Sequence, residues 1–244
     1  MYIVMGNGES RSAIDYSLLE GHITYGCNAI YRDFAPTNLV VIDNKMLHEV
    51  VTSGYVAHAN CYFRNFTLVP PLMYNEILSG ISLNERTTII ENKSTGFAFA
   101  YYGQEKTTEF YPETHTMCVV DKPVHYFTWV TSQDKIFDLN DYISSDPQDS
   151  GQSAVELCCQ VEKPETIYLL GFDLIIHNGL VNNIYKSTDC YAPDYALPVD
   201  GRGWVRDLNI IFDKYSNTKF IHVQDVSVFD NLETISVEQF RQLL

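Results

Sequence analysis

The residues best suited to ligand chemistry form a short glycine-containing turn near the start of the sequence. Gly6-Asn7-Gly8-Glu9-Ser10 follows the apolar run from Tyr2 to Met5 and precedes a helix-like pattern. A strand-turn-helix unit of this kind directs backbone N–H groups and a helix dipole toward an anion, and glycines let a ligand approach the backbone closely. The turn lacks the dinucleotide fingerprint, since Arg11 stands at the third glycine position. A tight βα turn without a ligand is the open alternative.

Two further polar residues, Asn28 and Asp43, end the predicted strands 23–27 and 39–42. The carboxyl ends of parallel strands meet at one edge of a sheet, so both side chains are expected beside the glycine turn. There they could read a base or a ribose by hydrogen bonds. Each residue is equally suited to capping the next helix, and this alternative stays open.

A second helix-strand unit supplies three more candidate site residues. Ser150-Gly151 opens the predicted helix 150–161, where a hydroxyl and free N–H groups could hold a phosphate or carboxylate. The strand 166–170 follows and runs into Gly171-Phe172-Asp173, which puts Asp173 at the same edge. An ordinary N-cap at Ser150 is the alternative.

The segment 176–203 is longer and more polar than a connector requires, which is typical of a lid or binding loop. Its side chains suit gripping a phosphate leaving group and closing over it. A surface loop without a binding role is the alternative. The residues concerned are Tyr185, Lys186, Tyr191, Tyr195, Asp200 and Arg202.

These elements together predict an α/β fold: one Rossmann-like domain over residues 1–244, with a parallel sheet, helices on both faces and the lid insertion. Further elements are expected as a helix at 12–19, a helix at 45–51, a strand at 55–59, a helix at 204–215 and a strand at 220–223. The aromatic and Thr-rich stretch 63–142 alternates like strands, and its topology is left open.

Composition limits the classes of partner. Lys and Arg number 16 against 31 Asp and Glu, a net charge of −15 that disfavours nucleic acids and anionic membrane surfaces. Arg11, Arg32, Lys186, Arg202 and Arg206 could still form a local anion site. Six cysteines without a CxxC pair indicate reduced thiols, and the histidines show no metal-ligand spacing. With no export signal and no membrane-spanning run, a cytoplasmic protein is expected.

The order of these motifs resembles that of the bacterial CMP-sialic-acid-dependent sialyltransferases, nearly end to end. The matching segments are Gly6–Ser10, Ile14-Asp15-Tyr16, Gly26-Cys27-Asn28, Ile42-Asp43, Ser150-Gly151 and Leu170–Asp173. The resemblance implies one nucleotide-binding α/β domain with a lid that transfers a sugar from a CMP donor without a metal ion or a permanently bound cofactor. It implies donor contacts from the turn, Asn28 and Asp43, and phosphate contacts from Tyr185 and Tyr191.

The sequence departs from that family at two positions. Asp43 stands where the family has Asn, and no histidine occurs between Asn178 and Lys219, where the family has its general base. Asp200 is the positional candidate for the base. The expected function is glycosyl transfer from a CMP-type donor to a glycan or small acceptor. A phosphotransferase or diphosphokinase-like relative and a non-catalytic nucleotide-binding protein remain alternatives, and a homo-oligomer is left open.

Overall fold

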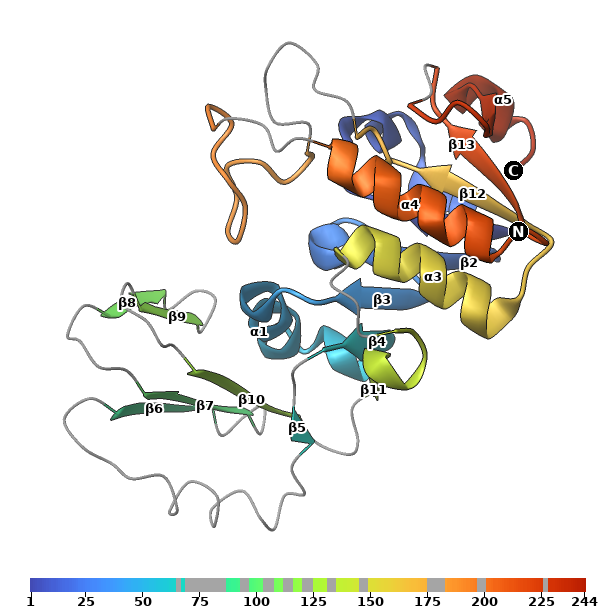
Figure 1. The fold of residues 1–244 in the computed structure, drawn as a ribbon. Helices are drawn as coiled ribbons and strands as arrows, with labels where there is room; N and C mark the ends of the chain where they lie inside the picture. Colours follow the sequence, from blue (N-terminus) through green and yellow to red (C-terminus); the bar gives the residue numbers. More distant parts are fainter. Residues whose placement is uncertain are drawn as a thin grey trace. The chain divides into compact units, whose positions relative to one another are not determined.

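The computed structural model of the chain describes residues 1–64, 135–144, 149–174, 183–196, 201–225 and 228–244, and the backbone of the strands between residues 67 and 130. The chain divides into two compact units, Met1–Val40 with Leu139–Leu244, and Val41–Asp138. Figure 1 shows the ribbon with its element labels.

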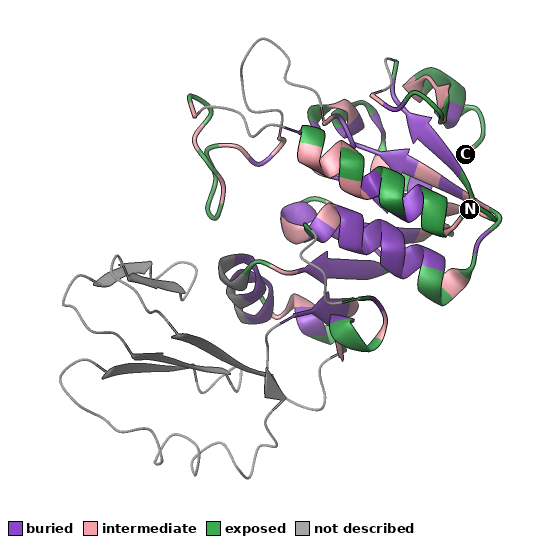
Figure 2. Ribbon diagram, in the orientation of Figure 1, coloured by how far each residue is buried: buried purple, intermediate pink, exposed green. Residues whose placement is uncertain are grey.

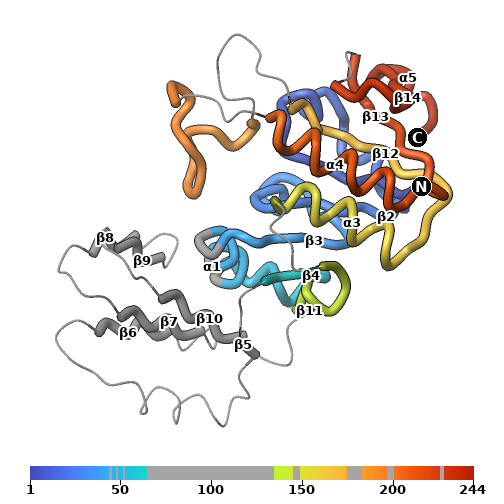
Figure 3. Tube along the Cα trace, in the orientation of Figure 1, coloured from blue at the N-terminus to red at the C-terminus, as the bar shows by residue number. Residues whose placement is uncertain are grey.

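A parallel sheet organises the fold, with strands in the order β11-β4-β3-β2-β1-β12-β13-β14. The register of its ladders pairs Met5 with both Gly26 and Leu170, so β1 lies between β2 and β12. The tube in Figure 3 shows how residues far apart in the sequence run side by side here. The predicted α/β class with a parallel sheet is therefore confirmed. The strands are β1 (Tyr2–Met5), β2 (Ile23–Cys27), β3 (Asn38–Val41), β4 (Asn60–Phe63), β11 (Ile136–Asp138), β12 (Thr166–Leu170), β13 (Lys219–Val223) and β14 (Glu233–Ile235).

Helices cover both faces of this sheet. Phe212 on α4 (Arg202–Lys214) packs against Phe220 on β13, whereas Phe240 on α5 (Val237–Arg241) packs against Tyr168 on β12. Ile167 pairs with Phe220, and Tyr168 is the next residue along its strand. Successive strand residues point to opposite faces, so α4 and α5 lie on opposite sides, as predicted.

Two neighbouring helices differ in how deeply they are buried. The helix α3 (Ser150–Glu162) packs against β1, β2 and α4, and nine of its 13 residues are buried. In α4 only Leu208, Ile211 and Phe212 are buried, so one stripe faces the core and the rest meets solvent. Figure 2 shows this contrast in its colouring. Because α3 is the helix beside β1 and β2, its first turn lies near the predicted site.

Two sequence-based expectations were wrong in detail. The predicted helix 12–19 is two short 3₁₀ helices, Glu9–Ala13 and Tyr16–Leu19. Between them Asp15 accepts a hydrogen bond from Ser17 N at 3.0 Å and starts the second one, which interrupts a continuous α-helix. The predicted strand 55–59 is the 3₁₀ helix Tyr55–Ala57, entered through Gly54 at φ +78°, and β4 begins only at Asn60.

In its described part, the second unit also contains two smaller sheets and one α-helix. A four-stranded sheet has the order β5-β10-β7-β6, and β8 pairs with β9. No helix in the described part is long and apolar enough to cross a membrane. The elements are α1 (Asn44–Thr52), β5 (Thr67–Leu68), β6 (Thr87–Asn92), β7 (Phe97–Tyr102), β8 (Thr108–Tyr111), β9 (Thr116–Val119) and β10 (His125–Val130).

Candidate functional site

The glycine turn packs directly onto the segment that follows β12. Gly6 N donates to Leu170 O at 2.8 Å, and Gly8 N donates to Gly171 O at 2.9 Å. A Cβ on Gly6 would lie 2.4 Å from Gly171 O, and one on Gly8 would lie 2.4 Å from Asp173 Cγ. The glycines are therefore required for the close approach of two chain segments, and their amides already have partners within the protein.

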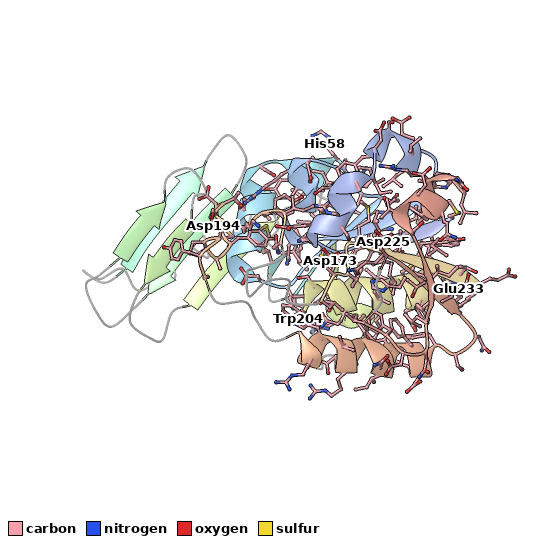
Figure 4. All side chains as sticks on the ribbon, turned by 90° about the horizontal axis from the view of Figure 1, so that it is seen from above. His58, Asp173, Asp194, Trp204, Asp225 and Glu233 are labelled. Atoms are coloured by element: carbon pink, nitrogen blue, oxygen red, sulfur yellow. The ribbon has the colours of Figure 1, made fainter. Side chains whose placement is uncertain are left out.

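Asp173 fastens the other end of this turn. Its carboxylate accepts from Ser10 N at 2.9 Å through one oxygen and from the Ser10 hydroxyl through the other. Asp173 is 4% exposed, and Figure 4 shows it among the side chains of this edge. Ser10 and Asp173 thus hold each other and fix the turn. The predicted donor contacts of both residues remain predictions.

Asn7 and Asn28 present amide oxygens that have no partner. Continuing the register of β1 and β2 past Met5 and Gly26 brings Asn7 level with Asn28. Asn7 Nδ2 donates to Cys27 O at 3.2 Å, which ties the two strand ends together. Oδ1 of Asn7 and Oδ1 of Asn28 are both buried without a hydrogen-bond partner. Two adjacent acceptors at the carboxyl edge are suited to N–H or O–H donors of a ligand.

Asn28 owes its position to an unusual backbone conformation. Its φ is +54°, in the left-handed region where Asn is one of the few tolerated residues besides glycine. A short 3₁₀ helix, Asn28–Arg32, starts here. The conformation turns the chain sharply at the end of β2, and the site depends on this turn.

Arg11 lies directly behind the turn and is fully buried. Its Nη2 donates to the Tyr185 hydroxyl at 2.6 Å and lies 3.7 Å from Asp33 Oδ2. The Tyr185 hydroxyl in turn donates to Asp33. Burial, followed by the hydrogen bond to Asp33, raises the pKa of Tyr185, so the phenol remains protonated near neutral pH.

Residues 183–196 of the predicted lid are docked against the strand ends. Ile184 N donates to Asn7 O at 2.9 Å, and the Tyr191 hydroxyl accepts from Asn7 Nδ2 at 3.2 Å and Ala29 N at 3.4 Å. Tyr185 and Tyr191 lie with ring centroids 5.5 Å apart. The structure thus brings both predicted tyrosines to the edge that carries Asn7 and Asn28.

One ion pair and two hydrogen bonds reinforce this docking from the outer side. Lys186 Nζ lies 2.5 Å from Glu9 Oε1, and Arg32 donates to Thr188 Oγ1 at 2.8 Å and to Asp189 O at 3.0 Å. Three of the basic residues named as an anion patch, Arg11, Arg32 and Lys186, therefore gather around one loop. Arg202 and Arg206 lie on α4 instead.

The first turn of α3 reaches the same edge. Ser150 is 3% exposed, and a Cβ on Gly151 would lie 3.6 Å from the Phe172 ring. Burial raises the pKa of the Cys27 thiol to about 12, while Arg11 lowers it and Asp149 raises it further. Asp149 is the N-cap residue, with no side-chain capping bond, so Ser150 is the first helical residue and not the cap.

Two predicted site residues are not brought to this edge by described contacts. Asp43 belongs to the second unit, where its Oδ1 accepts from Met46 N at 3.1 Å at the start of α1, as a helix cap does. Asp200, the predicted base, lies outside the described residues, as do 176–182 and 197–199 of the lid. Both assignments stay predictions.

The sequence analysis did not single out Asp33, and it did not show that Arg11 would lie at the centre of the site. Arg11 at the third glycine position could have indicated its central place, because a cation at a close-packed turn needs a partner. Nothing local marks Asp33, which meets Tyr185 across a long stretch of chain. Among the residues that the structure describes, no three His, Cys, Asp or Glu side chains gather as a metal ion would need.

Comparison with known proteins gives two structural likenesses. No protein-family profile matches the chain, and no curated protein matches it. It is similar to a crystal structure of a mutant of the α-2,3/8-sialyltransferase CstII, with 10% identity and a TM-score of 0.45. It is also similar to the sialyltransferase CST-II in complex with a trisaccharide acceptor and CMP, with 12% identity and a TM-score of 0.46. Each alignment covers 96% of this chain and 86% of the other. A likeness of this size does not decide what the chain binds.

Proposed function

We propose that the chain is a nucleotide-sugar-dependent glycosyltransferase that uses a CMP-type donor. The observation that carries the proposal is the pair of buried, unpartnered amide oxygens, Asn7 Oδ1 and Asn28 Oδ1, on adjacent strand ends. Cytosine carries an exocyclic amino group and ribose carries hydroxyls, and both are donors for such oxygens. Leaving the two acceptors unsatisfied costs about 1 to 3 kcal/mol each, which a bound nucleotide would recover.

The docked loop suits the transfer step. Tyr185 and Tyr191 bring two phenolic hydroxyls to the same edge. The Tyr185 hydroxyl donates to Asp33, which leaves the phosphate contact to Tyr191, and a phenol can donate a hydrogen bond without acting as a hydrolytic nucleophile. In the proposed reaction, the acceptor hydroxyl attacks the anomeric carbon and the nucleotide phosphate departs with the bonding electrons. Tyr191 then stabilises the departing phosphate, and Asp200 takes the proton of the acceptor.

Binding and turnover are tested in sequence. Titration calorimetry with CMP, ATP and NAD is expected to show the tightest binding for CMP, because the turn lacks both the third glycine of the dinucleotide motif and the Lys of a P-loop. Tighter binding of NAD would refute the mononucleotide site. Release of CMP from CMP-sialic acid in the presence of candidate acceptors then tests transfer.

The base assignment has a matched control in the same loop. Asp200→Asn is expected to lower transfer about 100- to 10,000-fold while leaving CMP affinity unchanged, because the base faces the acceptor. Asp194→Asn removes an exposed carboxylate from the same segment and is expected to leave both quantities unchanged. Equal transfer by Asp200→Asn and the unmodified protein would reject Asp200 as the base. CMP binding without transfer from any CMP-sugar would favour a non-catalytic nucleotide-binding protein.

A further inference from the structure

Arg11 is a buried cation whose hydrogen-bonding capacity is mostly unused. Its side chain has no exposed surface, and of its three nitrogens only Nη2 has a hydrogen bond, to the Tyr185 hydroxyl at 2.6 Å. Nε and Nη1 have no hydrogen-bond partner. A guanidinium carries five N–H donors, and burying charged donors without acceptors is among the costlier arrangements in a protein. The unused donors therefore call for an acceptor that binds there.

The surrounding side chains hold Arg11 in place without supplying that acceptor. Its Cζ lies 5.6 Å from the Tyr16 ring centroid and 5.4 Å from that of Tyr185, both within cation–π range. Gly171, at φ +74°, leaves room for the aliphatic stem, because a Cβ there would lie 3.2 Å from Arg11 Cβ. The site is thus shaped around the guanidinium while its Nε and Nη1 stay unpaired.

Among the described residues, the carboxylate within ion-pair distance of Arg11 lies beside Nη2. Asp33 lies 3.7 Å from Nη2 and is partly exposed, and both oxygens of Asp173 accept from Ser10. Glu9 pairs with Lys186. In a chain of net charge −15, Arg11, Arg32 and Lys186 nevertheless meet around one loop. The three cations thus meet three carboxylates, and it is the unpaired Nε and Nη1 of Arg11, not a surplus of positive charge, that favour a further acceptor such as a phosphate oxygen.

We propose that Arg11 binds the phosphate of the nucleotide through its unpartnered N–H groups. The inference rests on the proposed function, since it assigns a residue to the phosphate of the same ligand. Tyr185 covers the guanidinium, so the phosphate reaches Arg11 when the 183–196 loop moves. The loop then returns over the bound phosphate, so that Arg11 contacts both the loop and the leaving group and couples closure of the loop to the presence of a phosphate.

Titration calorimetry with CMP and cytidine on the full chain tests the assignment, because the two probes differ only in the phosphate. Arg11→Gln is expected to weaken CMP binding about 10- to 100-fold, in keeping with the loss of charge-assisted hydrogen bonds, and to leave cytidine binding unchanged. The matched control Arg206→Gln removes an arginine whose side chain is 74% exposed on α4, and is expected to change neither affinity.

A second variant covers the case in which Arg11→Gln does not fold. Arg11→Lys keeps the buried charge but loses the planar donor array, and is expected to weaken CMP binding about threefold to tenfold. In the unmodified protein the Arg11 Nε–H signal, assigned by its disappearance in Arg11→Lys, is expected to shift in NMR spectra on addition of CMP and not of cytidine.

The outcomes separate the two proposals. Equal CMP affinity in Arg11→Gln and the unmodified protein, or an equal loss for CMP and cytidine, would overturn the role of Arg11 and leave the nucleotide site standing. A signal from Nε–H that responds identically to both probes would do the same. Failure of the unmodified chain to bind either CMP or cytidine would reject both proposals.

Discussion

The carboxyl edge of the sheet has two sides that differ in how fully their polar atoms are used. On the β12 side, Gly6 N, Gly8 N and both oxygens of Asp173 have hydrogen-bond partners within the protein. On the β2 side, four of the seven buried side-chain atoms without partners in the described part belong to three residues, Asn7, Arg11 and Asn28. Buried polar groups are almost always paired. The β12 side is therefore framework, and the β2 side is the one that the proposed nucleotide would contact.

Crowding the framework side is expected to have the largest effect. Gly8→Ala places a Cβ 2.4 Å from Asp173 Cγ and 2.7 Å from Gly171 O, so the turn and the β12 segment must separate. The expected loss of unfolding free energy is about 2 to 4 kcal/mol, measured by urea denaturation. Gly203→Ala is the matched control, because nothing lies within 4 Å of its Cβ in the first turn of α4. Equal stability of the two variants would break the assignment of Gly8 to the framework.

Removing a ligand-facing amide is expected to change affinity and not stability. Asn28→Gly removes the unpartnered Oδ1 and tolerates the positive φ of +54°, which Ala at this position would not. CMP binding is expected to weaken by about 1 to 3 kcal/mol in calorimetry, the value of one or two hydrogen bonds. Lys163→Gly, at φ +48° after α3, controls for the backbone change. Unaltered affinity with a large loss of stability would show that Asn28 has a structural role and does not contact the ligand.

Weakening the contacts of the docked 183–196 loop tests the other side of the edge. Tyr185→Phe removes the hydroxyl that joins Arg11 to Asp33 and is expected to cost about 1 kcal/mol of loop docking. Trypsin cleavage after Lys186 should then be about five times faster, since cleavage follows the population of the open loop. Tyr195→Phe, at a residue 84% exposed, is expected to leave the rate unchanged. Equal cleavage of all three proteins would show that this hydroxyl does not hold the loop.

The smallest effect is expected from the protonation of His222, which changes the stability of the framework with pH. His222 is fully buried on β13 with Nε2 3.2 Å from Phe172 O, and burial lowers its pKa below 6.5. The unfolded chain then binds a proton that the folded chain refuses, so stability falls as pH drops below about 6.5. Urea midpoints measured from pH 7.5 downward should follow this decline, and His222→Gln should show a shallower one. Parallel declines in both proteins would exclude His222 as the source.

Local patterns in the sequence predicted the elements that form the edge. The strand of residues 2–5 followed by Gly-Asn-Gly, and the strand of 166–170 followed by Gly171, were predictable because apolar runs and turn residues act over a few positions. The prediction of a helix at 12–19 was wrong although its residues have helical spacing. Asp15 forms a local hydrogen bond with Ser17 that competes with the helix.

The sequence by itself determined a parallel α/β fold and the polar residues that end its strands, because strand period and turn chemistry are local properties. Only the tertiary structure decided which of those polar groups are already used. The amides of the glycine turn are engaged because Leu170 and Gly171 lie beside it, and Arg11 is buried because Tyr185 returns to cover it. These contacts join residues more than 150 positions apart, and hydrogen-bond satisfaction depends on such neighbours and not on residue type.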